Sequence, residues 1–375
     1  MAAPEVIIVG GGVIGCAIAY YLAQAGVQVT ILERGEVGGE ASGASAGLLA
    51  PLELSLESSS LLDLCLASLP LHPSLADTLR EETGIDVEYQ RSGILRVALS
   101  DEDADDLRAL VGRQQAGGVM EWVDAEALRH LEPRLAAARG GVYSPQYHQV
   151  NAHRLTQALA QAAVARGAAL RQGVVVTGFV TNGSRVMGVR TGEGRLMAEQ
   201  VILAAGSWTA ALGRRLGVTL PVKPMRGQML AFPDFSSPLR HILLGKNGGY
   251  LAPKANGFLF VGSTVEDVGF RKNTTAKGLA GLRRMAAALV PSLAYAEVAS
   301  DWAGLRPGSP DGLPILGPVP GWEGLSVASG HFRKGILLAP ITGRLMAQRL
   351  TQGRTEIPLE PFSAGRFAVP EHEGG

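Results

Sequence analysis

Three glycines near the start of the chain have the spacing that brings a backbone close to a pyrophosphate. Gly10, Gly12 and Gly15 follow the aliphatic run Val6–Val9, and Gly26 ends the helical pattern that comes after them. In a G-x-G-x-x-G turn the first glycine permits the tight turn, the second lets the pyrophosphate approach, and the third lets helix and strand pack closely. The unpaired N–H groups at the start of the helix would face the phosphates. The pattern therefore predicts a dinucleotide-binding site.

A second aliphatic run, Val27–Leu32, completes a βαβ unit, and Glu33 stands at its C-terminal end. A carboxylate there can accept hydrogen bonds from ribose hydroxyl groups. An unrelated glycine turn is the alternative, but the joint occurrence of both strands, the helix and the acid favours a dinucleotide. The uncharged run Val6–Leu32 also has the look of a signal peptide or membrane span. No basic stretch precedes it and Gly10–Gly12 interrupt it, so we expect a cytoplasmic protein without a membrane segment.

Two arginines and a tyrosine in the second half are candidates for binding a carboxylate. Arg306 lies in Trp-Ala-Gly-Leu-Arg-Pro-Gly, Arg333 in Gly-His-Phe-Arg-Lys-Gly, and Tyr250 begins Tyr-Leu-Ala-Pro. A planar guanidinium binds a carboxylate through two parallel hydrogen bonds. From the residues alone, Arg306 could equally be a structural partner of Asp301 or Asp311, and Tyr250 a packed core residue.

Composition narrows the classes of function. A chain of 375 residues is long enough for two domains, and its formal net charge of +0 argues against a broad nucleic-acid or anionic-membrane surface. Cys16 and Cys65 are the only cysteines and lie far apart, so they form neither a disulfide framework nor a zinc site. The seven histidines have no ligand spacing. We therefore expect no metal.

The elements that would position these residues alternate between two kinds of pattern. Buried or alternating strands are expected around 93–98, at an edge strand 140–144, and at 168–176, 201–208, 221–232, 250–253, 257–262 and 325–328, with a hairpin at Asn182–Gly183. Helices are expected over 57–83, from the acid-rich run 101–106, within 121–139, and at 152–166, 275–289 and 346–350. The segment 35–51 is rich in Gly, Ala and Ser, which suits a loop and short helix laid against a flat cofactor.

The opening βαβ unit, the segment Ala44–Leu48 and the three motifs around Tyr250, Arg306 and Arg333 together resemble the D-amino-acid oxidase family of flavoenzymes, closest to its glycine oxidase branch. The resemblance covers nearly the whole chain. It implies an α/β fold in which a GxGxxG FAD-binding domain with a doubly wound sheet is interleaved with a mainly antiparallel β substrate domain. The FAD-binding domain would comprise 1–84, 148–218 and 303–365, the substrate domain 85–147 and 219–302, and 366–375 would be a flexible tail.

The resemblance also assigns roles to residues. Arg306 and Tyr250 would hold the substrate carboxylate, with Arg333 and Leu48 beside them. Residues expected to contact FAD are Gly10, Gly12, Val13, Ile14, Gly15, Glu33, Arg34, Ala41, Ser42, Ala46, Gly47, Leu48, Val176, Ala205, Gly206, Trp208, His331, Phe332, Arg333, Lys334, Gly335, Ile336 and Leu337. The helix that Gly335 opens would point its positive end at the flavin. Leu48, Gly248 and Lys334 differ from common residues of the family, which leaves substrate preference open.

The implied reaction is FAD-dependent oxidative deamination of glycine, sarcosine or small D-amino acids. Hydride passes to the flavin without a protein acid or base, and O₂ then gives hydrogen peroxide beside the 2-oxo acid and ammonia or amine. No cysteine follows Cys65, so the FAD is expected to be non-covalent. The family further implies a homotetramer and supply of glycine imine for thiamine thiazole synthesis. The alternatives are a quinone-linked D-amino-acid dehydrogenase, a sarcosine oxidase-like enzyme, an NAD-dependent dehydrogenase, or a nucleotide-binding regulator without turnover.

Overall fold

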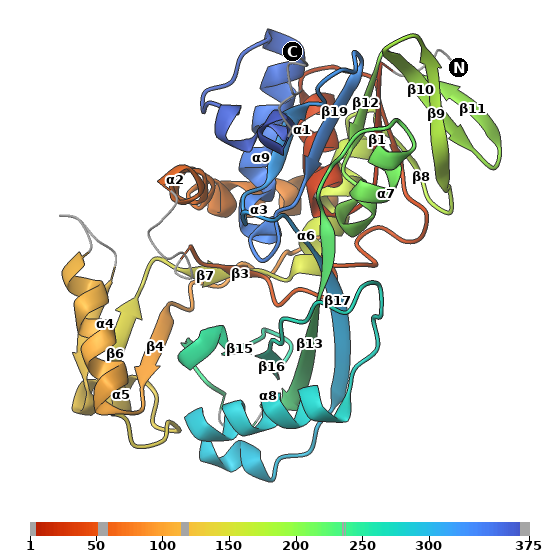
Figure 1. The fold of residues 1–375 in the computed structure, drawn as a ribbon. Helices are drawn as coiled ribbons and strands as arrows, with labels where there is room; N and C mark the ends of the chain where they lie inside the picture. The colour runs from red at the N-terminus through yellow and green to blue at the C-terminus, as the bar shows by residue number, and fades with distance from the viewer. Residues whose placement is uncertain (1–4, 52–58, 114–119, 235, 237, 368–375) are drawn as a thin grey trace, which may run out of the picture.

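The molecule is built on two large sheets, which Figure 1 shows one above the other. The computed structural model describes residues 5–51, 59–113, 120–234, 236 and 238–367. The upper sheet has six strands, in the order β18–β19–β12–β1–β2–β8, and the lower has eight, in the order β17–β13–β16–β15–β14–β4–β6–β5. This combination confirms the expected fold class.

The six-stranded sheet is parallel except at one edge, where β18 runs antiparallel to β19. Its strands are β1 (Val6–Val9), β2 (Val29–Leu32), β8 (Ala169–Arg171), β12 (Gln200–Leu203), β18 (Ile315–Pro318) and β19 (Leu325–Ser329). Every residue of β1 is buried, as its aliphatic sequence predicts for a central parallel strand. β2 begins two residues later than expected, because the N–H of Val27 still bonds the Leu22 carbonyl of the preceding helix (3.1 Å).

The two faces of this sheet are covered by different layers. On one face, alternate residues such as Ile8 and Ile202 pack against helices, namely α1 (Val13–Gln24), α6 (Ala152–Ala165) and α9 (Gly335–Gln352). On the other face, Ile7 and Leu203 pack against a three-stranded antiparallel sheet. That sheet comprises β9 (Val176–Asn182), β10 (Arg185–Thr191) and β11 (Gly194–Met197). The expected hairpin at Asn182–Gly183 joins β9 to β10.

The eight-stranded sheet is antiparallel except where β14 pairs with β4. Its strands are β4 (Ile94–Ala98), β5 (Glu121–Asp124), β6 (Gly140–Ser144), β13 (Lys223–Pro233), β14 (Ile242–Leu244), β15 (Tyr250–Pro253), β16 (Phe258–Gly262) and β17 (Ser300–Gly308). Helix α8 (Ala276–Leu289) packs Leu282 and Ala286 into the core of this sheet. In Figure 1 the long strands β13 and β17 lead from the upper half of the molecule into the lower half.

Two expectations about the lower sheet need correction. The helix expected within 121–139 is present as α5 (Ala125–Leu131), but residues 121–124 form strand β5. The helix begins only after Asp124, whose carboxylate caps it by accepting from the N–H groups of Glu126 and Ala127. Strand β6 is consequently interior, between β4 and β5, and not at the edge.

Other boundaries also differ from the sequence pattern. Of the expected strand 168–176, only Ala169–Arg171 forms strand β8. Gly173 (φ 74°) then turns the chain toward β9, which begins at Val176. The helix at 346–350 and the one opened by Gly335 are a single helix of 18 residues, α9, with Pro340 inside it.

The helical region 57–83 forms α2 (Ser59–Ser68) and α3 (Leu71–Thr83), and the acid-rich run opens α4 (Asp101–Arg113). Residues 57 and 58 lie outside the described part of the chain.

The tail was expected to be flexible from residue 366. Arg366 instead lies in a short 3₁₀ helix, Ala364–Phe367, and its guanidinium pairs with Asp311 (2.7 Å). Residues 368–375 lie outside the described residues. The domain boundaries drawn from the sequence stay a prediction.

Candidate active site

A single cavity of about 770 Å³ connects the glycine-rich turn to the far arginines. This volume lies within the range of about 300–1,000 Å³ that is typical of small-molecule sites. Nearly all the residues expected to contact cofactor or substrate line it. Gly15 and Leu337 do not line the cavity that the described residues form, because both are packed behind its wall.

The glycine-rich turn has the close contacts that its sequence predicts. Gly10 has φ 118°, and a side-chain carbon there would lie 2.4 Å from the Ala204 carbonyl oxygen. A carbon on Gly15 would lie 2.0 Å from the Gly10 carbonyl oxygen, so Gly15 serves the packing of α1 onto β1. The start of α1 thereby faces the cavity, and the Ser42 hydroxyl accepts from the N–H of Val13 (2.9 Å).

Glu33 follows β2 and lines the cavity, where a ribose acceptor is expected. Its carboxylate already accepts from the backbone N–H of Gly11 (2.7 Å) and of Gly35 (2.8 Å). These bonds fix the carboxylate at the cavity edge. Beside it, the Arg34 guanidinium lies 3.6 Å from the centre of the Trp208 ring, a cation–π contact between two residues that line the cavity.

The Gly- and Ala-rich segment 35–51 passes along the cavity and is held from behind. Gly47 has φ 79°, and a side-chain carbon there would lie 2.0 Å from the Val150 carbonyl oxygen. The ammonium group of Lys254 donates to the carbonyl oxygens of Ala46 (2.9 Å) and Val150 (3.1 Å) and to the side-chain oxygen of Gln149 (2.8 Å). Burial lowers the pKa of Lys254 to about 8. The sequence carried no signal for this lysine, since its acceptors are distant in the chain.

His331 and Phe332 lie on the opposite wall, just before α9. The N–H of Phe332, whose φ of 48° is unusual for a residue with a side chain, donates to the Pro307 carbonyl (2.8 Å). Burial lowers the pKa of His331 to about 3, so the imidazole is neutral. Its Nε2 contacts the Thr342 hydroxyl (3.1 Å), and its buried Nδ1 has no partner among the described residues.

Arg306 projects from β17 into the cavity and lies over Gly227 of the neighbouring strand β13. Its Nη1 donates to the Thr264 carbonyl (3.0 Å) and its Nη2 to the Ser263 hydroxyl (2.5 Å). A side-chain carbon on Gly227 would lie 2.1 Å from Nη2, so only glycine leaves room for the guanidinium. The two acids that the sequence offered as structural partners are engaged by other groups: Asp311 by Arg366 and Asp301 by Thr274.

Tyr250 and Arg333 line the same cavity as Arg306. The Tyr250 hydroxyl donates to the thioether sulfur of Met229 (3.3 Å), and Arg333 donates to the Gly248 carbonyl (3.1 Å). The structure therefore brings the three residues of the expected carboxylate site to one space. Gly227, Met229, Leu244 and Ser263 also line it and were missed by the sequence analysis, which had no pattern to separate them from ordinary strand residues.

The donor set fits FAD. One end of the cavity offers a glycine turn and a helix N-terminus for a pyrophosphate. The N-terminus of α9 also lines the cavity, together with the neutral imidazole of His331, whose Nδ1 has no partner among the described residues. Within the described part of the chain, no cluster of three or more His, Cys, Asp or Glu side chains could hold a metal, and no helix is long and apolar enough to cross a membrane. Fold and cavity are thus typical of a dinucleotide-dependent oxidoreductase, and Arg306 and Arg333 line the same cavity.

Comparisons with known proteins make the class specific. The FAD dependent oxidoreductase (DAO) family matches residues 5–349, and the chain belongs to this family. It is 40% identical to the glycine oxidase of Geobacillus kaustophilus over 96% of this chain and 97% of that one, and 39% identical to that of Pseudomonas putida over 96% and 98%. It is 35% identical to the hydrogen cyanide synthase subunit HcnC of Pseudomonas aeruginosa over 97% and 96%.

Solved structures agree with these relatives. The crystal structure of the Geobacillus kaustophilus glycine oxidase matches with a TM-score of 0.92 at 40% identity, covering 98% of this chain and 99% of that one. Iminodiacetate oxidase from Chelativorans matches with a TM-score of 0.89 at 27% identity, covering 96% and 98%. The protein is an FAD-dependent oxidoreductase similar to glycine oxidases, which sets aside the NAD-dependent dehydrogenase and the regulator without turnover.

Proposed function

We propose that the enzyme oxidatively deaminates glycine and other small amines that carry a carboxylate, such as sarcosine and small D-amino acids. The observation that supports this is the convergence of Arg306, Tyr250 and Arg333 on the cavity that begins at the glycine-rich turn. Two cationic side chains and a phenol at one end of an otherwise largely apolar space suit a small carboxylate.

The proposed binding mode follows from the contacts. The hydrogen bonds from Arg306 to Ser263 and Thr264 fix the plane of the guanidinium before the substrate arrives. A thioether is a weak acceptor, so the Tyr250 hydroxyl would turn from Met229 to a carboxylate oxygen. Charge-assisted hydrogen bonds of this kind contribute about 1.5–3 kcal/mol each. The carboxylate would therefore determine where the rest of the substrate lies.

Positioning is the main catalytic contribution that we assign to the protein. The residues that line the cavity would hold FAD, which would supply an acceptor for the hydride of the substrate Cα–H bond and a route for the two electrons to O₂. For glycine the balanced outcome is glyoxylate, ammonia and hydrogen peroxide from glycine, water and O₂. Holding the substrate carbon against the cofactor supplies most of the rate enhancement in such a reaction, and the neutral His331 is a wall residue rather than a base.

The test is peroxide release from the purified holoenzyme in air-saturated buffer with glycine, sarcosine, D-alanine and D-proline in parallel. We expect peroxide with glycine or sarcosine. Flavin bleaching without peroxide would instead support the quinone-linked dehydrogenase. In the variant Arg306→Ala we expect the KM for glycine to rise at least about tenfold with FAD retained, because loss of a partner in a desolvated ion pair costs about 2–5 kcal/mol. An unchanged KM would remove Arg306 from the substrate site.

Finer features of the proposal rest on the resemblance alone. They are non-covalent FAD, a homotetramer in the cytoplasm, and supply of glycine imine for thiamine thiazole synthesis. The two cysteines, Cys16 and Cys65, are both buried, which supports the non-covalent cofactor. Acid precipitation that leaves the yellow colour in the pellet would contradict it, and light scattering on the eluted holoenzyme decides the oligomeric state.

A further inference from the structure

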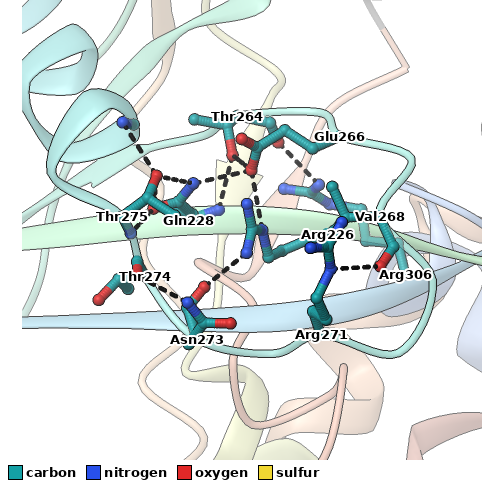
Figure 2. Close-up of polar contacts among 11 residues, drawn as sticks. Arg226, Gln228, Thr264, Glu266, Val268, Arg271, Asn273, Thr274, Thr275 and Arg306 are labelled. Atoms are coloured by element: carbon teal, nitrogen blue, oxygen red, sulfur yellow. Dashed lines mark hydrogen bonds and ion pairs between the residues drawn. The ribbon is translucent and has the colours of Figure 1, made fainter.

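A polar network lies behind Arg306 on the far side of strand β13. Figure 2 shows Arg226, Gln228 and Thr264 converging on Glu266. One carboxylate oxygen of Glu266 accepts from Nε of Arg226 (3.0 Å), Nε2 of Gln228 (2.8 Å) and the Thr264 hydroxyl (2.9 Å). These four residues form the Glu266 network.

The Glu266 network does not reach the cavity itself. Arg226 and Gln228 alternate with Gly227 along β13, so their side chains leave the opposite face of the sheet from the one that carries Arg306. None of the four lines the cavity that the described residues form. The hydrogen-bonded connection from these side chains to Arg306 runs through Thr264.

Thr264 connects the Glu266 network to the guanidinium. Its carbonyl accepts from Arg306 (3.0 Å), while its hydroxyl accepts from the backbone N–H of Gln228 (3.0 Å) and donates to Glu266 (2.9 Å). Ser263, the neighbouring residue, accepts from the other guanidinium nitrogen (2.5 Å). These two acceptors of Arg306 thus belong to one short segment, and the hydroxyl of Thr264 ties that segment to Glu266.

The segment after β16 needs such support because it has left the regular sheet. Strand β16 ends at Gly262, and beyond it an isolated bridge joins the backbones of Arg226 and Glu266. Arg226 also donates to the Asn273 carbonyl (2.8 Å), which fastens the far end of the same loop. Two backbone hydrogen bonds between Arg226 and Glu266 (2.9 and 3.0 Å) and these side-chain bonds therefore together hold the loop on β13.

The charge balance of the Glu266 network suits a rigid support. The side chain of Arg226 is only 6% exposed, so its charge requires an ionic partner, and Glu266, whose side chain is 30% exposed, provides it. Burial alone raises the pKa of Glu266, but the hydrogen bonds from Arg226, Gln228 and Thr264 outweigh this and hold the pKa below its usual range. The carboxylate stays ionised and keeps all its donors.

We infer that the Glu266 network is a positioning device for the substrate carboxylate, which acts by fixing the two oxygens that orient Arg306. This inference rests on the proposed function. A purely structural network would stabilise the loop without affecting carboxylate affinity. The two cases differ in whether the effect of a network variant depends on Arg306.

The experiment measures acetate binding to the holoenzyme from the change in the flavin absorption spectrum, together with KM and kcat for glycine. The variants are Thr264→Val, which removes the hydroxyl at nearly constant shape, and Glu266→Gln. The matched control is Asp267→Asn, which removes the exposed ion pair with Lys223 from the same loop (2.6 Å). FAD content is measured first, and Glu266→Gln replaces Thr264→Val if the latter yields no yellow protein.

We expect both network variants to weaken acetate binding at least about fivefold, within the range seen for residues that act through another residue. The KM for glycine should rise in proportion, and Asp267→Asn should bind acetate as the parent does. In an Arg306→Ala background, Thr264→Val should have no further effect on acetate affinity.

Two results would overturn the inference while leaving the proposed function intact. One is parental acetate binding in both network variants when Arg306→Ala binds weakly. The other is a Thr264→Val effect that is equally large with and without Arg306. If Arg306→Ala itself bound acetate as the parent does, both the carboxylate site and the inference would fall.

Discussion

Replacing Gly227 by alanine tests the proposed carboxylate site without replacing a charged residue. Gly227 lies opposite Gly304 in the pairing of β13 with β17, on the face from which Arg306 projects. An added methyl group would lie 2.1 Å from Nη2, 2.2 Å from Nη1 and 2.3 Å from Cζ of Arg306. Ordinary contacts between such atoms are about 3.5–4.0 Å, so the guanidinium must retreat by more than about 1 Å.

A displacement of about 1 Å of a group that positions substrate can cost a factor of about 100 in rate. We therefore expect Gly227→Ala to lower kcat/KM for glycine by about 10- to 100-fold with FAD content unchanged. Peroxide release by steady-state kinetics measures this, and Gly192→Ala is the matched control, since a methyl group there meets nothing within 4 Å. Parental kcat/KM in Gly227→Ala would refute the assignment of Arg306 to the substrate.

Two further predictions concern buried titratable groups. Lys254→Met should lower the free energy of unfolding by about 2 kcal/mol, because the carbonyl of Ala46 and the side chain of Gln149 lose a buried donor. The variant should also release FAD more readily during gel filtration. A Tm and an FAD content equal to those of the parent would contradict this prediction. Burial holds the pKa of His331 at about 3 and that of His72 at about 4, so below about pH 6.5 the unfolded chain takes up protons that the folded chain does not. Stability should fall by up to about 1.4 kcal/mol per pH unit for each histidine between about pH 6 and pH 4, and urea unfolding of His72→Asn should show a shallower fall. Stability profiles that fall equally steeply with pH in the parent and in His72→Asn would contradict the lowered pKa of His72.

Local sequence patterns predicted the elements whose stability is decided locally. The βαβ unit from Val6 to Leu32 combines aliphatic strands with glycines at a characteristic spacing, and Gly15 packs against Gly10 of the same unit, so residue type indicates the structure. The contact of Gly10 with Ala204, beside β12, is long-range and adds to this local pattern. The same holds for the hairpin at Asn182–Gly183. Strand β5 could not be found this way, because its four residues are partly exposed and it exists only by pairing with β6.

In the candidate site, too, residues in contiguous motifs were predicted, and residues defined by distant contacts were missed. The residues around the glycine turn and before α9 belong to contiguous motifs, and nearly all of them line the cavity as expected. Lys254, Glu266 and Gly227 were missed because each is defined by contacts with residues far away in the chain: Ala46, Arg226 and Arg306. A lone lysine, glutamate or glycine in a strand or loop has no spacing that distinguishes it from a surface or packing residue.

The substrate end and the cofactor end of the cavity come from different sheets, yet hydrogen bonds fix their separation. Strand β17 carries Arg306, and the residues before and after Arg306 are bonded to the half of the molecule that contains the six-stranded sheet. The Leu305 carbonyl accepts from the Ser207 hydroxyl (2.9 Å), and the Pro307 carbonyl accepts from the N–H of Phe332 (2.8 Å). The left-handed φ of Phe332 costs about 1–3 kcal/mol, which such surrounding bonds must offset. Because that turn also sets the direction of its neighbour Arg333, the two arginines are held relative to each other by backbone bonds. Rotation of one half against the other would break these bonds before it changed the distance between carboxylate site and cofactor. The proposed carboxylate site is therefore preorganised, and we expect a small carboxylate to bind there with little rearrangement.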